Sequence, residues 1–371
     1  MLIYLGISAL IAFGSALTLL LIGEMSLLAS THLVLAVGVL PLIFGAIAHF
    51  VPVLTRSGAA PRAVWLAPLL LQLAGLLVFL HFSGVAGNAA LHAAAAIALV
   101  ASLGLSVWLM ARAARTLGQP HPGWRWYLAA LLMLALGLAL VPAMVIWPES
   151  RQGLRLLHLH LNTLGFIGLT AIGTLQVLLP TVLSGPDADA GARLRRDFPL
   201  AVAAVLLIAA GAAWWWPWSL LGSVLFAYVA GRLGWSWWRR YGWRTLVDDG
   251  ASASLAAALG GFLLLLVLGV AHGFGLLNGH DAVAAFIAAF LLPLVTGALS
   301  QLFPVWRYPG RRTAARDRVR GKLASGGALR AALFVAAGVL LAGGLDVGLW
   351  LAAAALLLFV FGLIRGVLKL F

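Results

Sequence analysis

The chain of 371 residues contains no cysteine. Disulfides, thiolate-bound metals, iron-sulfur clusters and cysteine nucleophiles are therefore excluded. Carboxylates are scarce as well, because Asp and Glu together number only ten. Nine histidines remain, and neutral imidazole is the main transition-metal ligand left to such a chain. Any metal chemistry must therefore depend on histidine.

Charge is scarce throughout, since only 9% of residues are charged while 63% are hydrophobic and the mean hydropathy is +1.07. These values lie far outside the range of soluble proteins. The net charge of +14 and the pI near 11.6 would otherwise suggest a nucleic-acid partner. The sequence has too little polar surface to solvate a domain outside the bilayer, so it predicts no nucleic-acid partner and a lipid environment.

Long apolar runs divide the chain at charged, Gly-rich or Pro-rich breaks. A bilayer core about 30 Å thick needs roughly 20 apolar residues for each helix. The sequence thus predicts an all-α polytopic membrane protein forming a single transmembrane domain over residues 1–371. We expect about twelve transmembrane helices, at approximately 2–22, 31–55, 64–83, 89–111, 126–147, 155–183, 198–216, 218–238, 252–273, 281–305, 328–345 and 347–368.

Basic residues alternate between the two ends of these spans. With a cytoplasmic N-terminus, 22 of the 24 Lys and Arg residues fall on the cytoplasmic side, and only Arg151 and Arg155 do not. The positive-inside rule then predicts a bacterial inner-membrane protein with both termini in the cytoplasm. The densest basic run, residues 311–322, is interpreted as a determinant of this topology. A site for anionic lipid or a partner is the alternative.

Three of the expected spans end in one shared pattern, a Gly followed seven residues later by a Pro. The pairs are Gly45 and Pro52, Gly173 and Pro180, and Gly297 and Pro304. Successive pairs lie 128 and 124 residues apart, a period of four helices. We therefore expect three pseudo-symmetric four-helix units, repeats of approximately 1–125, 126–250 and 251–371.

Histidines gather on the outer side of the predicted bilayer. Ionisable groups at membrane depth are costly and are functional by default, so seven are candidate metal ligands: His32, His81, His92, His158, His160, His272 and His280. His32 and His160 each lie thirteen residues before the repeat glycine. His158 and His160 differ by about 200° around a helix, so they cannot readily chelate one metal. His49 and His121 lie inward and are expected to be a core residue and a loop residue.

Twelve helices in three arcs, with a histidine opening the second span before GAIAHFVPVLTRSG and a His-x-His opening the sixth, resemble the heme-copper oxidase subunit I superfamily. The pattern HLVLAVGVLPLIFGAIAHFVP is most similar to the NnrS-type heme- and copper-containing membrane proteins, which are linked to nitric oxide. The resemblance implies that His32 and His160 ligate a low-spin heme and that His158 ligates a second heme. The remaining outer histidines, His81, His92, His272 and His280, are candidates for copper or a further axial bond.

The resemblance therefore implies heme b, with copper as a further cofactor, and a role in nitric oxide handling or in electron transfer from a quinol or a periplasmic donor. If the protein turns over, the expected enzyme is an oxidoreductase of the nitric oxide reductase or oxidase type. We expect no proton pumping, because all ten carboxylates fall in loops or at the ends of the predicted spans. A metal or small-solute permease, and a cofactor-poor structural subunit of a respiratory complex, are the alternatives.

Overall fold

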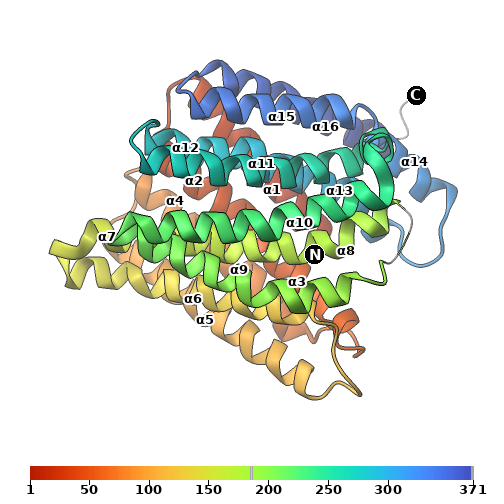
Figure 1. The fold of residues 1–371 in the computed structure, drawn as a ribbon, viewed down its shortest axis with the longest axis horizontal. Coiled ribbons are helices and arrows are strands. Elements are labelled where there is room, and N and C mark those ends of the chain that lie inside the picture. Colours follow the sequence, from red (N-terminus) through yellow and green to blue (C-terminus); the bar gives the residue numbers. More distant parts are fainter. Residues whose placement is uncertain (184, 186, 369–371) are drawn as a thin grey trace. The chain divides into compact units, whose positions relative to one another are not determined.

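The computed structural model describes residues 1–183, 185 and 187–368, and the backbone alone for residues 279–281. Over these residues the chain is helical and contains no strand (Figure 1). The α-helices are α1 (Leu2–Leu21), α2 (Leu27–His32), α3 (Leu40–Leu54), α4 (Leu66–Phe82), α5 (Asn88–Ala114), α6 (Gly123–Ile146), α7 (Arg151–His160), α8 (Leu169–Leu183), α9 (Ala190–Ala213), α10 (Trp216–Asp248), α11 (Gly250–Gly273), α12 (Gly279–Phe286), α13 (Leu292–Arg307), α14 (Ala314–Ala324), α15 (Gly327–Ala342) and α16 (Val347–Val367). The predicted all-α class is confirmed.

Eleven helices in the described part of the chain are long and apolar enough to cross a membrane. They correspond to eleven of the twelve expected spans. The exception is the eighth, 218–238, which is helical within α10 but does not reach the hydropathy of the others. Arg232 and the glycines and tryptophans of this helix lower its mean hydropathy. A multi-pass membrane protein is therefore confirmed, with the eighth span helical but less apolar than expected.

The chain divides into two compact units. The first comprises Met1–Thr174 with Ala188–Phe226, and the second comprises Leu175–Asp187 with Ala227–Phe371. The boundary falls within α8 and within α10. The first unit therefore holds the first expected repeat and most of the second, and the other unit holds the third.

Three of the spans contain a π-helical stretch, in which the backbone makes a wider turn than in an α-helix. These stretches are η1 (Leu33–Val39), η4 (Leu161–Gly168) and η5 (Ile287–Leu291). η1 and η4 each begin twelve residues before the repeat glycine, and η5 begins ten before it. π-Helical turns are rare and are frequent at functional sites. Their equivalent placement adds a structural feature to the repeated sequence pattern.

Each π-helical stretch packs closely against a neighbouring helix. A side chain on Gly75 of α4 would collide with the carbonyl of Ala36 in η1, and one on Gly261 of α11 would collide with that of Ala289 in η5. In η4 the glycine is on the π-helical side, where a Cβ on Gly165 would lie 2.8 Å from Cβ of Met133 in α6. Glycine at these positions lets the backbones approach closely, as small residues do between membrane helices.

A helix that the sequence did not predict, α14, forms within the basic run. Val319 and Leu323 are buried, at 2% and 0% exposure. α14 packs on α16, where a Cβ on Gly362 would lie 2.8 Å from the Lys322 carbonyl oxygen. α16 itself runs beside α15 in the second unit (Figure 1). Tertiary contacts therefore order a segment that was expected to be a charged loop.

Candidate functional site: a histidine group in the first unit

The first unit brings together histidines from three separate helices. His32 is the last residue of α2, His81 lies near the end of α4, and His158 lies in α7. The imidazole of His32 lies close enough to those of His158 and His81 for the positive charge of either ring, when protonated, to act on it. Its ring also lies 4.4 Å from that of Phe82, between centroids and tilted by 30°, which restricts its orientation. The sequence paired His32 with His160, whereas the structure places His32 near His158 and His81.

The three histidines expected to bind heme share one hydrogen-bond arrangement. Nδ1 of His32 donates to the Leu28 carbonyl at 2.8 Å, Nδ1 of His158 to the Gly137 carbonyl at 2.7 Å, and Nδ1 of His160 to the Leu156 carbonyl at 2.8 Å. A carbonyl oxygen can only accept, so in each neutral ring Nδ1 carries the proton and Nε2 carries the lone pair. Metal-ligating histidines are held in the same way, with the second ring nitrogen donating to a carbonyl.

His158 and His160 are held by different partners. His160 bonds to a carbonyl of its own helix, whereas His158 reaches across to Gly137 in α6. This agrees with the expectation that the two rings leave the helix in different directions. The two imidazoles are thus suited to separate ligands rather than to one chelated ion.

Asn162 completes the surroundings of His158. Its Nδ2 donates to the backbone carbonyl of His158 at 2.7 Å, and its Oδ1 is buried without a hydrogen-bond partner. A Cβ on Gly137 would lie 2.8 Å from Nδ2 of Asn162. The amide of Asn162 therefore fits here only because residue 137 is glycine. An unsatisfied buried acceptor beside a ligand-like imidazole fits a site that accommodates a further group. Neither Gly137 nor Asn162 belongs to a pattern that the sequence makes visible.

His81 and the other candidate ligands are held by loop carbonyls or lie outside the group of His32 and His158. Nδ1 of His81 bonds to the Ala86 carbonyl at 3.2 Å and Nδ1 of His272 to the Leu277 carbonyl at 2.8 Å. His92 lies in the first turns of α5, and the side chain of His280 lies outside the described residues. No group of three or more His, Asp or Glu among the described residues is placed to hold one metal ion.

One carboxylate lies deeper than the sequence suggested. Asp197 was expected just outside a span, but the structure places it within α9, at 1% exposure. Its Oδ1 lies 3.3 Å from Nε of Arg196. The expectation that every carboxylate lies in a loop or at the end of a span is corrected here, and the buried charge is compensated by a neighbouring guanidinium.

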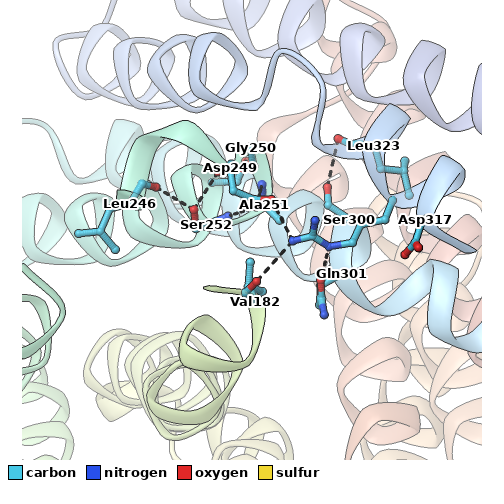
Figure 2. A network of polar contacts seen from close by, with 12 residues as sticks. Val182, Leu246, Asp249, Gly250, Ala251, Ser252, Ser300, Gln301, Asp317 and Leu323 are labelled. Carbon is cyan, nitrogen blue, oxygen red and sulfur yellow. Dashed lines mark hydrogen bonds and ion pairs between the residues drawn. The ribbon is translucent and has the colours of Figure 1, made fainter. Parts of the chain in front are cut away.

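A second polar group, in the second unit, surrounds Arg320 of α14. Its members Gln301, Asp249 and Val182 are labelled in Figure 2. Nε of Arg320 donates to Oε1 of Gln301 at 2.8 Å, and its Nη2 donates to Oδ2 of Asp249 at 2.9 Å and to the Val182 carbonyl at 3.4 Å. Oδ1 of Asp249 accepts from the backbone N–H groups of Ala251 and Ser252, which caps α11. The bond between Gln301 and Arg320 could not be predicted from the sequence, because the two residues are 19 apart on separate helices.

Arg330 is a further residue that sequence reasoning missed. It is 1% exposed, and its guanidinium donates to the Leu323 carbonyl at 3.1 Å and to the Ser325 carbonyl at 3.4 Å. These carbonyls belong to the end of α14, where a cation is favourable. The guanidinium also lies 5.1 Å from the ring centroid of Phe359. Beside this helix end, a cavity of about 440 Å³ is lined by the starts of α11 and α15.

The chain matches no protein-family model, and no curated protein is significantly similar to it.

Proposed function

We propose that the chain is a heme protein of the bacterial inner membrane, built from three pseudo-symmetric four-helix units, that handles nitric oxide or transfers electrons from a quinol or a periplasmic donor. The observation that carries this proposal is the pair His32 and His158. In both imidazoles a carbonyl accepts the Nδ1 proton, which leaves the lone pair on Nε2, and the two rings, on α2 and α7, lie near one another. The resemblance of the His-x-His and second-span patterns to heme-copper oxidases and NnrS-type proteins supports it.

His32 and His158 would hold the proposed low-spin heme, because their two imidazoles lie near one another. The sequence pattern alone favoured His32 with His160. In this arrangement His160 would hold the second heme. A bound heme supplies an iron that takes up one electron at a time and binds a diatomic gas. The protein holds the imidazoles neutral and oriented through the carbonyls of Leu28, Gly137 and Leu156.

Proton pumping is not part of the proposal. A pump needs titratable groups within its spans, and the buried carboxylate that the structure describes in a span, Asp197, is ion-paired with Arg196. Copper is also left out, because the described residues do not form a multi-histidine site.

The test is an optical spectrum of the detergent-purified protein, oxidised and dithionite-reduced. We expect a Soret band and a sharp reduced α-band. His32→Ala and His158→Ala should each abolish the low-spin bands, because each removes one axial ligand, whereas His160→Ala should retain them. His92→Ala is the matched control, since it removes an outer histidine outside this group.

Each other outcome has a definite meaning. Loss of the low-spin bands in His160→Ala but not in His158→Ala would exchange the roles of these two histidines. A purified protein that carries a metal without heme would indicate the permease, and one that carries neither would indicate the structural subunit. Either of the last two results would overturn the proposal.

A further inference from the structure

The segment 311–322 carries six basic residues and one acidic residue, Asp317. A determinant of membrane topology needs only charge near the end of a span. From Ala314 the segment is instead an ordered helix, α14 (Ala314–Ala324), held in three ways, and Arg311 and Arg312 lie just before it. Val319 and Leu323 are buried against the bundle, Gly362 of α16 admits its backbone, and Arg320 is bonded to Gln301 and Asp249. The basic side chains of α14 therefore extend from a backbone that tertiary contacts hold in place.

Internal contacts occupy some of these charges but not all of them. Arg312 pairs with Asp317 at 2.7 Å and Arg320 with Asp249 at 2.9 Å, and Arg316 donates to the Gly310 carbonyl at 3.4 Å. Three cations remain, and none has an acidic partner among the residues that the structure describes: Arg311, Arg318 and Lys322.

Two of these cations are close neighbours on the helix. Arg318 and Lys322 are four residues apart, so they lie on one face of α14, and like charges at this spacing destabilise a helix. Arg318 and Arg311 are exposed, and Lys322 is half-buried. A fixed cluster of like charges at an accessible surface is favourable when an anion binds between them.

The position of α14 relative to the spans indicates which anion. The helix lies between the end of α13 at Arg307 and the start of α15 at Gly327, both of which belong to apolar spans. Aromatic residues occupy the same end, where the guanidinium of Arg307 lies 5.4 Å from the ring centroid of Tyr308. Tyrosine and tryptophan are enriched at the level of the lipid headgroups. The cations therefore lie where phosphate groups of the bilayer are most concentrated.

We propose that Arg311, Arg318 and Lys322 bind the headgroups of anionic phospholipids in the leaflet that borders this end of the protein. Each basic residue near an anionic membrane surface contributes roughly a fivefold increase in affinity. The inference does not depend on heme binding.

The experiment measures lipid retention by native mass spectrometry of the full chain, in detergent micelles that contain equal amounts of phosphatidylglycerol and phosphatidylcholine. We expect the unmodified protein to retain phosphatidylglycerol selectively. The triple variant Arg311→Gln, Arg318→Gln, Lys322→Gln should lose this selectivity by at least roughly tenfold. The double variant Arg318→Lys, Lys322→Arg should retain it, because the charges are kept.

The matched control is the triple variant Arg115→Gln, Arg239→Gln, Arg244→Gln. It removes the same charge from exposed positions that the sequence places on the same side of the membrane, and it should keep the selectivity. Equal losses in the two triple variants would overturn the proposal in favour of diffuse attraction. Unchanged retention in the first would also overturn it. Displacement of the lipid by inorganic phosphate at the same concentration would identify an anion site that is not a lipid site.

Discussion

His121 shows how one imidazole can be held neutral outside the membrane. It lies between α5 and α6, and its Nδ1 accepts a hydrogen bond from the backbone N–H of Gly123 at 3.2 Å. Its own backbone N–H donates to the Leu54 carbonyl at 2.9 Å. Burial, with a smaller contribution from the positive charge of Arg195, lowers the pKa of His121 below its usual 6.5. A protonated Nδ1 could no longer accept the bond from Gly123, so the neutral ring belongs to the folded state.

We therefore predict that the folded protein loses stability as the pH falls. The unfolded chain takes up a proton on His121 near pH 6.5, whereas the folded protein resists this until the pH reaches its lowered pKa. The stabilising effect is complete above pH 6.5 and declines below it. The thermal midpoint in detergent, measured from pH 8 to pH 5, should fall less steeply in His121→Gln than in the unmodified protein. Equal slopes would contradict the role given to this ring.

At the residue scale, the sequence indicated which histidines lie on the outer side but not how they are held. Counting along the spans placed His32 and His160 at the same distance from the repeat glycine. The hydrogen bond of His158 to Gly137 could not be predicted, because it depends on how two helices pack. The buried Oδ1 of Asn162, which has no hydrogen-bond partner, could not be predicted either, because its burial depends on the absence of a side chain at Gly137.

Among the elements, the π-helical stretches combine an unusual helix geometry with close packing against a neighbouring helix. α4 packs against η1 at Gly75, where the absence of a side chain leaves room for the Ala36 carbonyl. The sequence predicted the spans well, because their long apolar runs leave few alternatives in a bilayer. It did not reveal the π-helical turns, since runs such as LVLAVGV fit an α-helix equally well. α14 was missed because Val319 and Leu323 are its only buried side chains.

We predict that Gly75→Ala destabilises the first unit, because the new methyl group would collide with the backbone of η1. The control is Gly104→Ala in α5, where a Cβ would meet nothing within 4 Å. In that position alanine should be neutral or stabilising by up to about 1 kcal/mol, because it favours a helix over glycine. The thermal midpoint of Gly75→Ala in detergent should therefore lie below that of Gly104→Ala. The reverse order would show that η1 and α4 do not approach closely.

For the whole molecule, the number of membrane crossings decides on which side of the membrane each charged loop lies. The two compact units do not coincide with the three sequence repeats, because contacts join the first repeat to most of the second. α10 is the expected crossing with the lowest mean hydropathy, because Arg232 lies within its apolar stretch. With twelve crossings the two termini share one side of the membrane, and with eleven they do not.

We predict twelve crossings with both termini in the cytoplasm, on the basis of 22 basic residues on one side and two on the other. Reporter fusions should be periplasmic after Glu24, Gly84 and Asp346, and cytoplasmic after Gly58, Pro120 and Arg312. The fusions after Arg312 and Asp346 are the decisive ones, because both follow α10. A periplasmic signal after Arg312 would mean that α10 does not cross, and would place α14 outside the cytoplasm.

The wide turn in η1 sets the direction of His32 relative to α3. A π-helical turn holds one residue more than an α-helical turn. It therefore takes up an extra residue locally, and the helical parts on either side of it keep their register. If LVLAVGV wound as a continuous α-helix instead, the extra residue would rotate everything before it, His32 included, by about 100° relative to α3. The direction of this imidazole thus depends on a backbone turn that begins one residue beyond it.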